Sequence, residues 1–554
     1  MDLEQLLILL VAALAVTAFA RKVGWPAPLL VTGVAILVSF FLVDEVKIDS
    51  EVILTIVLPP LLYSAALDVS FQDFRTSLRQ IRRLGIGLVV ITALVVGGVA
   101  NILIGDISLA AALLLGAIVA PPDAVSATAI GKKLGLPRRV MTVLSGESLI
   151  NDAAALTMFT LFLNGATKGS SFGFNDGLLL LLINIVGGVG VGLVLAFIVQ
   201  FVRTRIKDPL IETVIGLLVP FGAYLIAEEL HGSGVLAVVA AGLHLGYNAP
   251  KGSYVMRLQE QPILASLDVL LEAFVFALIG RQFKNVLFET IDSPRGLGVS
   301  LGIADILRAI TILIRPAYVF VSYYRRQIPV FKRRRQRRGR DEPEMSWRDL
   351  TVISWTGMRG VVTLAAAASV VASSDVEAKD LIFLTAFVVT IGTLLLQGLT
   401  LPWLIKKLEV SDPNQEQRDQ EAEQALMSRT FKIAMEQMKP TWQKLAAKVG
   451  PEKAEKLMAR IQGSAAARMS AMQDVNDDAS VAKTAPFGKG GIAKPEMAQY
   501  MTDMRRQMNE LRRKVLIEER DKGNLDDEVM RTVLMELDTE EFALDKSWQS
   551  RMRS

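Results

Sequence analysis

Four polar side chains able to bind a cation or a proton stand together in an apolar stretch at about 140–163: Glu147, Ser148, Asn151 and Asp152. An ionised group at the middle of a bilayer costs roughly 2.5–3.5 kcal/mol on insertion scales, so such groups face protein or a water-filled cavity. At about 100° per residue, Ser148 and Asp152 share one helix face, and Glu147 and Asn151 share the adjoining one. Apolar sequence continues on both sides, which predicts one uninterrupted helix with a polar stripe.

A second polar segment interrupts the apolar run at 108–131, where Pro121 and Pro122 precede Asp123. Two prolines remove two backbone donors and clash with the preceding turns, so we expect a broken helix. Irregular backbone at membrane depth is tolerated only against protein or a wet cavity. Carbonyls freed around Pro122 would then be available as cation ligands beside Asp123. The alternative is an ordinary proline kink in which Asp123 is a local cap.

The third polar segment, 354–360, places Arg359 between glycines inside the apolar run 350–372. A lone guanidinium in that position needs a carboxylate, with which arginine forms a two-point contact. Glu147 is the stripe carboxylate that we do not assign to an ion. The chemistry therefore predicts a buried ion pair between Glu147 and Arg359.

Other charges in apolar runs carry less information. Asp305, Arg308 and Arg315 recur at spacings of three and seven in the run 296–320. They form a polar face towards protein, for which a structural network is favoured over an ion funnel. Glu272 is assigned to an exposed helix end.

The composition predicts an all-α polytopic membrane protein. The chain of 554 residues is 51% hydrophobic and contains repeated apolar runs of about 17–25 residues. With no Cys and only two His, disulfides, thiolate metal sites and histidine relays are excluded or disfavoured. We expect thirteen spans. They lie at about 4–20, 28–43, 52–67, 83–105, 108–131, 140–163, 178–203, 209–229, 232–247, 262–280, 296–320, 350–372 and 380–406.

Basic residues concentrate on alternate loops, which sets the expected topology. Ten Lys and Arg lie between Arg325 and Arg348 alone. The N-terminus is therefore predicted outside and the C-terminus in the cytoplasm. The basic cluster at 332–338 is interpreted as a topology anchor that touches anionic lipid. Binding of nucleic acid is the disfavoured alternative for that cluster.

From Ser411 the composition changes to a charged, helix-forming tail. We divide the chain into a transmembrane domain, 1–406, and a cytoplasmic regulatory or oligomerisation tail, 407–554, with a flexible linker at about 475–494. Apolar residues after Pro495 recur at spacings of four and three, which predicts a helix that packs against a partner helix or against the tail itself. They are Met497, Met501, Met504, Met508, Leu511 and Val515.

Together the polar segments describe an oxygen-lined site at mid-depth, where two interrupted helices meet the stripe. Carboxylate, hydroxyl and carbonyl oxygens suit a hard cation such as Na⁺. The two interrupted helices are the fifth and twelfth expected spans. An offset of seven is what two inverted six-span repeats separated by one linking span give.

At these residues the chain resembles monovalent cation/proton antiporters of the sodium/proton exchanger type, in their bacterial branch. The motifs that carry the resemblance are the segments 58–63, 146–152, 227–235 and 357–360, and it covers residues 1–406. The resemblance implies a homodimer in which a core domain moves past a dimerisation domain. It also implies that Glu147 and Arg359 form a structural ion pair and that no cofactor is bound.

The resemblance implies a role for each remaining site residue. Asp152 would bind the cation and carry the proton. Asp123 and Ser148 would complete the shell of the Na⁺ ion with the carbonyl of Pro122, and Asn151 would support the site. The family's motif usually has Thr before the fifth-span Asp and Pro after it, whereas here Pro122 precedes Asp123 and Ala follows. Preference among Na⁺, K⁺ and Li⁺ is therefore open.

The resulting hypothesis is a secondary-active antiporter that exports Na⁺ in exchange for H⁺ and serves pH homeostasis, in a bacterial inner membrane. The Asn151-Asp152 pair leaves one titratable carboxylate on the ion face, and family members with Asn-Asp are associated with electroneutral one-for-one exchange. The alternative is a cation channel or an ion sensor that signals through the tail. An intramembrane enzyme is disfavoured by the lack of a nucleophile–base pair or a metal cluster, and ATP-driven pumping by the lack of a P-loop.

Overall fold

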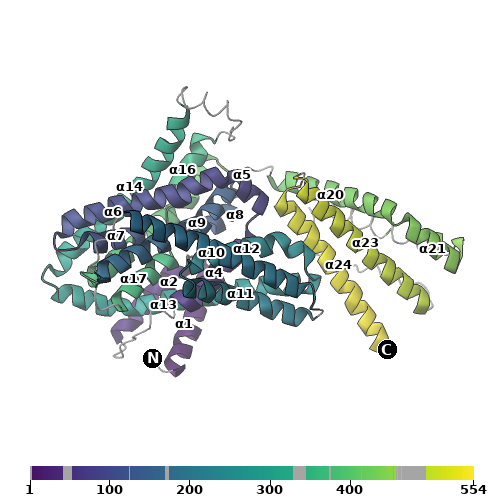
Figure 1. The fold of residues 1–554 in the computed structure, drawn as a ribbon, viewed down its shortest axis with the longest axis horizontal. Helices are drawn as coiled ribbons and strands as arrows, with labels where there is room; N and C mark the ends of the chain where they lie inside the picture. The colour runs from purple at the N-terminus through teal and green to yellow at the C-terminus, as the bar shows by residue number, and fades with distance from the viewer. Residues whose placement is uncertain are drawn as a thin grey trace. The chain divides into compact units, whose positions relative to one another are not determined.

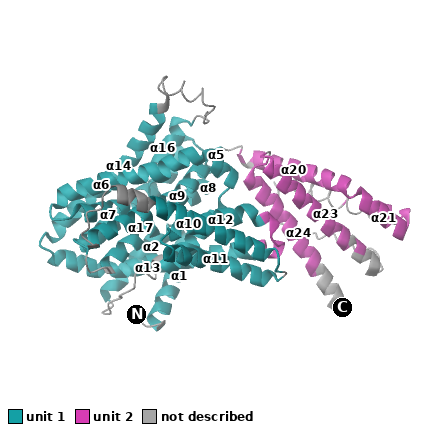
Figure 2. Ribbon diagram, viewed as in Figure 1, with its two compact units in different colours: residues 1–249, 259–413 teal, residues 250–258, 414–554 magenta. Residues whose placement is uncertain are grey.

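The computed structural model describes the chain apart from residues 1–2, 42–52, 124, 169–173, 207, 328–344, 373–375, 413–414, 453, 457, 460–462, 464–494, 524 and 554. The basic cluster 332–338 and the expected linker 475–494 lie outside the described residues. Figure 2 shows the two compact units into which the chain divides. Unit 1 is 1–249 with 259–413, and unit 2 is 250–258 with 414–554.

From α1 to α19 the chain is built from helices only, as far as the structure describes it (Figure 1), and residues 250–258 of this stretch belong to unit 2. In chain order the elements are α1 Leu3–Val23, α2 Ala27–Phe41, η1 Ile53–Val57, α4 Leu58–Asp68, α5 Phe71–Arg82, η2 Arg83–Leu88, α6 Val89–Ile104, α7 Leu109–Val119, α8 Val125–Lys133, α9 Arg138–Lys168, α10 Phe174–Arg203, α11 Pro209–Glu229, α12 Gly234–Asn248, η3 Ala249–Lys251, α13 Tyr254–Asp292, α14 Gly296–Gln327, α16 Trp347–Trp355, α17 Val361–Ala372, α18 Lys379–Thr393, η4 Leu394–Gly398 and α19 Leu399–Leu408. The predicted all-α class is confirmed for these residues.

Within the described residues, eight helical segments are long and apolar enough to cross a membrane. Four shorter apolar helices accompany them, at Ala27–Phe41, Thr55–Asp68, Leu109–Val119 and Val361–Val371. Two of these short helices flank the polar segments identified from the sequence. The count of thirteen spans and the inverted repeats stay predictions.

Two membrane helices are interrupted where the sequence predicts it. Residues 120–123 between α7 and α8, and residues 356–360 between α16 and α17, have no helical structure. Prolines 121 and 122 account for the first interruption, because they cannot supply the helix's amide hydrogens. By contrast, α9 runs without a break through the polar stripe. The predicted interruptions and the uninterrupted stripe helix are confirmed.

Small residues let the first interrupted helix pack tightly against its neighbour. Figure 1 shows α6 alongside α7, and the two helices are in extensive contact. A Cβ at Gly116 would lie 2.1 Å from the carbonyl oxygen of Ala93, and one at Gly97 would lie 2.8 Å from the Cα of Leu113. Only glycine permits this backbone approach, which holds α7 in place beside α6.

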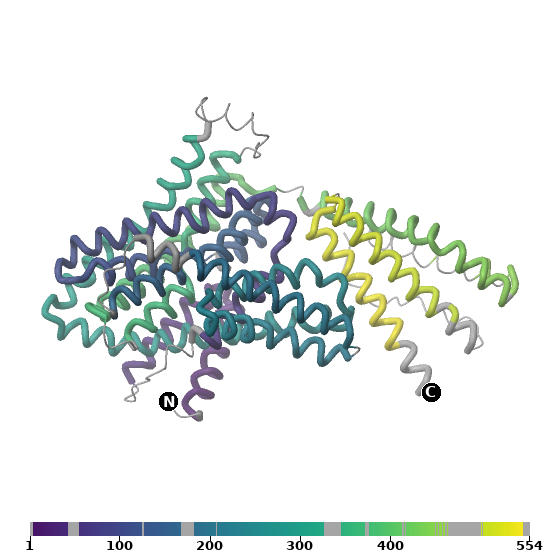
Figure 3. Tube along the Cα trace, viewed as in Figure 1, coloured from purple at the N-terminus to yellow at the C-terminus, as the bar shows by residue number. Residues whose placement is uncertain are grey.

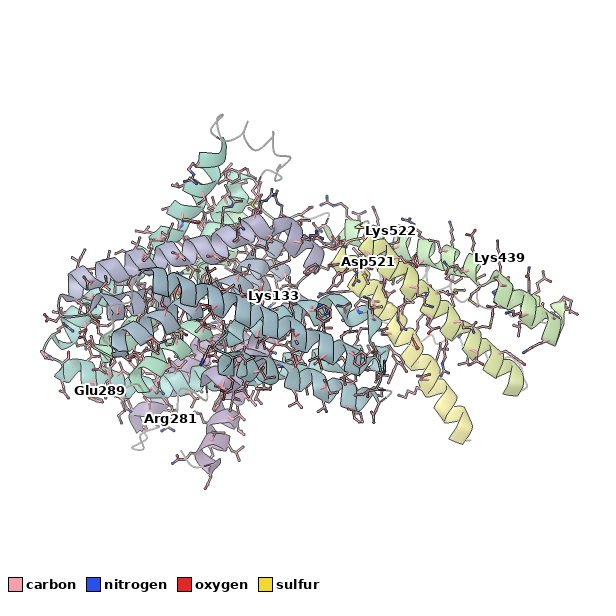
Figure 4. All side chains as sticks on the ribbon, in the orientation of Figure 1. Lys133, Arg281, Glu289, Lys439, Asp521 and Lys522 are labelled. Carbon is pink, nitrogen blue, oxygen red and sulfur yellow. The ribbon has the colours of Figure 1, made fainter. Side chains whose placement is uncertain are left out.

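Unit 2 contains the tail helices α20 Gln415–Gln437, α21 Lys439–Val449, α23 Pro495–Asp521 and α24 Asp527–Arg553. Figure 3 shows α20, α23 and α24 lying side by side. Lys439 and Asp521 on these helices, and Lys522 just after α23, are exposed (Figure 4). This arrangement buries an apolar face between the helices, together with a few charged side chains such as Asp538.

The apolar seam after Pro495 folds back onto the tail. Met504 and Met508 of α23 are buried against Met438 and Trp442. Met438 joins α20 to α21, and Trp442 lies on α21. A second cluster joins α20, α23 and α24 through residues Leu426, Met427, Leu516, Val529, Met530, Val533 and Leu537. Of the two alternatives for the seam, packing within the tail is the one that the structure shows.

Candidate ion-binding site

The polar stripe of α9 is buried. Glu147 is 1% exposed, Asn151 0% and Asp152 9%, and Ser148 is half-buried. Ser148 and Asp152 are four residues apart in an unbroken helix, so they share a face as predicted. The polar side chains of Glu147, Asn151 and Asp152 therefore have little access to water. They need interaction partners from other parts of the protein.

Asn151 connects the stripe to the first helix interruption. Its Nδ2 donates a hydrogen bond of 2.6 Å to the carbonyl oxygen of Pro122. Among the described residues its Oδ1 is buried and has no hydrogen-bond partner. A carbonyl oxygen has two lone pairs, so Pro122 keeps one acceptor site beside the one that Asn151 occupies.

The two interruptions meet at Asp123. The amide of Asp123 donates a hydrogen bond of 2.6 Å to the carbonyl of Met358. A Cβ at Gly360 would lie 2.3 Å from Oδ2 of Asp123 and 2.7 Å from its Cβ. The absence of a side chain at residue 360 is therefore what lets the Asp123 carboxylate occupy this position.

Arg359 holds the carbonyls that the first interruption frees. Its Nε donates to the carbonyl of Val119 at 2.9 Å and its Nη2 to that of Ala120 at 3.3 Å, while Nη1 donates to the carbonyl of Gly357. The last carbonyls of a helix have no partner within the helix and carry partial negative charge. The guanidinium therefore stabilises the end of α7 and fixes it to the second interruption.

The predicted ion pair between Glu147 and Arg359 is corrected by the structure. Both carboxylate oxygens of Glu147 accept hydrogen bonds from Arg315 of α14, one of them at 2.8 Å from Nη2. Arg315 also donates from Nε to the carbonyl of Ile353 at 2.9 Å. The guanidinium of Arg359 instead donates hydrogen bonds to backbone carbonyls. These carbonyls need donors because the helix is broken there. Arg315 was one of two arginines, with Arg308, in the apolar run 296–320, and the sequence did not single it out.

The other charges of α14 are separate from this pair. Arg308 Nη2 lies 3.0 Å from Asp305 Oδ1, and both side chains are partly exposed. The side chain of Arg308 packs against Gly392 of α18. The predicted structural network is therefore confirmed only as a pair of Asp305 with Arg308, because Arg315 binds Glu147 instead.

Asp152 follows Asn151 and Asp123 follows Pro122, so the hydrogen bond between Asn151 and Pro122 brings both carboxylates to the same region of the fold, where their charges repel each other. In a medium of low dielectric constant such repulsion is strong, and a bound cation or a proton relieves it. The half-buried Ser148 stands on the same face of α9 as Asp152. The structure thus brings the stripe, Pro122 and Asp123 together, as the sequence predicts.

Sequence reasoning missed a second pair of acidic residues, on α13. The Oγ of Ser64 donates a hydrogen bond of 2.6 Å to Oδ2 of Asp268. Glu272, one turn later, is half-buried and interacts electrostatically with Asp123 and Asp268. Glu272 lies inside the helix Tyr254–Asp292 and not at its end, which corrects the expectation. The signal was two carboxylates four residues apart in an apolar run.

A family model described as "Sodium/hydrogen exchanger, transmembrane" matches residues 6–407, which is most of the chain. The chain belongs to the sodium/hydrogen exchanger family. This membership makes it a multi-pass membrane protein of an ion-transporting family, as the resemblance in the sequence implied.

Relatives in other organisms agree with the family. An uncharacterized Na⁺/H⁺ exchanger of Mycobacterium tuberculosis is 33% identical over 391 residues, covering 70% of this chain and 70% of its own. The Na⁺/H⁺ antiporter ApNhaP of Aphanothece halophytica is 32% identical over 419 residues, covering 74% of this chain and 75% of its own. The solved structure of MjNhaP1, a sodium proton antiporter of Methanocaldococcus jannaschii, has a TM-score of 0.59 at 20% identity, covering 74% and 98%. This sodium/hydrogen exchanger shares the fold of MjNhaP1.

Proposed function

We propose that this exchanger is a secondary-active antiporter that exchanges Na⁺ for H⁺ across a cell membrane, with Asp152 as the shared site of cation and proton. The observation that carries the proposal is the position of Asp152, which is buried beside Asp123 at the point where two interrupted helices meet. Interrupted helices at mid-membrane are the usual site of ion coordination in secondary transporters. The antiporter relatives support the choice of Na⁺ and H⁺.

In this proposal the ion's shell consists of four oxygen ligands from α9 and the first interruption. Asp152, Asp123 and Ser148 supply side-chain oxygens, and Pro122 supplies the lone pair of its carbonyl that Asn151 does not use. Because Pro122 replaces the threonine that usually precedes this aspartate, one hydroxyl ligand is missing. The transport of K⁺ and Li⁺ is therefore to be compared with that of Na⁺. No resident cofactor is part of the proposal.

The proposed exchange is electroneutral, one Na⁺ for one H⁺. Glu147 is neutralised by Arg315, and Asn151 has no charge at any pH, so neither changes its charge during exchange. Asp152 holds either a cation or a proton, and competition between the two couples their fluxes. Asp123 keeps its charge throughout as a ligand.

We further propose the assembly and orientation that the family resemblance implies. The protein is a homodimer with thirteen spans in two inverted repeats, the N-terminus outside and the C-terminus in the cytoplasm. Exchange proceeds by alternating access, in which a core domain carrying α7, α9 and α16 moves past the dimerisation domain. Basic residues between Arg325 and Arg348 bind anionic lipid. The tail regulates exchange or stabilises the dimer.

The test is dissipation of a pH gradient in proteoliposomes when Na⁺, K⁺ or Li⁺ is added. We expect cation-dependent proton movement that is lost in Asp152→Asn and unaffected by a clamped membrane voltage. Asp305→Asn is the matched control, because that carboxylate is partly exposed and pairs within its own helix. Cation flux without proton movement would favour the channel or sensor instead.

A further inference from the structure

A segment from the membrane part of the chain is integrated into the tail unit. Residues 250–258, which lead from α12 into the first turns of α13, cluster with residues 414–554. Within unit 2, Arg257 Nε lies 2.6 Å from Oδ2 of Asp538 and Nη2 lies 2.6 Å from Oδ1. The side chain of Asp538 is 2% exposed and that of Arg257 11%. Removing one partner of a two-point contact shielded from water is much more costly than breaking an exposed ion pair.

Tail residues complete the same contact. Nη2 of Arg513, on α23, lies 2.8 Å from Oδ1 of Asp538, so this carboxylate joins α23 to the segment 250–258. One of the other Arg257 nitrogens, Nη1, donates to the carbonyl of Gly252 at 2.6 Å, which fixes the shape of the segment. Asp538 therefore binds two arginines: Arg257 of the segment 250–258 and Arg513 of the tail.

A second carboxylate of α24 repeats this arrangement two turns later. Asp545 accepts a hydrogen bond from the hydroxyl of Tyr254 and another from Arg506 of α23. Asp538 and Asp545 are seven residues apart and share a face of α24, while Tyr254 and Arg257 are three apart and share a face of α13. We call these four residues the latch.

We propose that the latch is a regulatory device through which the tail restrains ion exchange, so that its release raises the rate. The inference rests on the proposed function. The helix that the latch holds, α13, continues past residue 258 to Glu260, which forms a buried ion pair of 2.8 Å with Arg203. Two turns further, Asp268 accepts the hydrogen bond from Ser64. The latch thus holds the beginning of a helix that reaches the candidate site.

A restraint at the end of a helix selects among its conformations. Exchange requires the protein to pass between at least two states, and a contact that favours one of them slows the passage. Holding Tyr254 and Arg257 in place limits the movement of the first turns of α13, which lead into Glu260 and Pro262. Release removes that limit without touching any residue of the candidate site.

The chain contains no cysteine, which makes a cross-linking test unambiguous. In the full-length variant Arg257→Cys/Asp538→Cys, a bismaleimide with a reducible spacer replaces the ion pair. We expect efficient cross-linking within one chain, slow exchange in proteoliposomes while the spacer is intact, and a rate roughly fivefold higher after reduction, a typical size for coupling between sites. Each single cysteine variant controls for modification alone.

Two further variants separate the latch from damage to the tail. Arg257→Gln leaves Arg513 bound to Asp538 and is expected to raise the rate as spacer reduction does. Arg429→Gln removes an internal pair of the tail, 3.1 Å from Glu519, and is expected to leave the rate unchanged.

The outcomes distinguish the latch from the proposed function. Failure to cross-link, equal rates before and after reduction, or a slower rate after reduction overturns the latch. A wild type without any cation-dependent proton movement overturns the proposed function and the regulatory role together, while cross-linking on a gel still shows whether the contact exists.

Discussion

Arg315 donates hydrogen bonds to both carboxylate oxygens of Glu147, and both side chains are 2% exposed. Arg315 stands on α14 and Glu147 on the stripe helix α9, so the pair fixes the helix of the candidate site to another span. Removing only one partner of a buried ion pair leaves the other charge uncompensated, whereas removing both charges does not. The pair therefore has a structural role beside the ion-binding groups.

Removing one partner of this pair should destabilise the protein strongly. Arg315→Gln leaves Glu147 buried without its cation, which typically costs roughly 3–5 kcal/mol. We expect a large fall in the thermal unfolding temperature in detergent, and partial recovery in Glu147→Gln/Arg315→Gln, where neither charge remains. Arg308→Gln is the control, since its pair with Asp305 is partly exposed. A double variant no more stable than Arg315→Gln contradicts this role.

Adding one methyl group at Gly360 should weaken cation binding. In Gly360→Ala the new Cβ collides with the Asp123 carboxylate, which must move. We expect the Na⁺ concentration for half-maximal exchange to rise about tenfold, equivalent to about 1.4 kcal/mol. Gly298→Ala is the matched control, because nothing lies within 4 Å of a Cβ at that residue. An equal effect of both variants would refute a specific role for Asp123.

Replacing the Asn151 amide by a carboxylate should change the net charge transported in each exchange cycle. Asn151→Asp removes the donor to the Pro122 carbonyl and adds a second titratable group beside Asp152. We expect exchange to become sensitive to membrane voltage, measured as a current on a supported membrane. Asn151→Ser, which keeps a neutral hydroxyl donor, should remain voltage-insensitive. A current in the wild type would instead reject electroneutral exchange.

The tail should depend on the seam that follows Pro495. Met508 is buried against Met438 and Trp442, and removing such a buried side chain typically costs about 2–5 kcal/mol. We expect Met508→Ala to raise the rate of proteolysis within the tail and leave the membrane helices protected. Met535→Ala, at a residue 49% exposed, is the control. Equal protection of both variants would mean that the seam contributes nothing to tail stability.

Local chemistry explains which features were predictable. The break at Pro121 and Pro122 follows from missing amide hydrogens, and the burial of the stripe at 147–152 follows from the cost of charge in a bilayer. Both depend on residues that are neighbours in sequence. The partner of Glu147 depends instead on how α9 packs against α14, which no local pattern specifies. The sequence paired Glu147 with Arg359 and assigned Arg315 to a separate network, and only the three-dimensional structure reveals the pair of Arg315 with Glu147.

The same limit applies to the acidic residues of α13 and to the tail. Glu272 was assigned to a helix end because the sequence marks only the apolar run 262–280. The helix itself is longer and extends from Tyr254 to Asp292. The seam of Met504 and Met508 left its partner undetermined, since an apolar stripe fits any complementary helix. Contacts distant in sequence, such as Arg257 with Asp538, have no signature in either segment alone.

The central claim is that one carboxylate serves both ions, and proton release on Na⁺ binding tests it most directly. Calorimetric titration of the purified protein with Na⁺, in buffers of different ionisation enthalpy, counts the protons released for each cation bound. At a pH where the Na⁺-free site is protonated, a cation that displaces this proton must release it, so we predict about one proton per Na⁺ bound, and none in Asp152→Asn. Na⁺ binding without proton release, or release that persists in Asp152→Asn, would contradict a shared site at this residue.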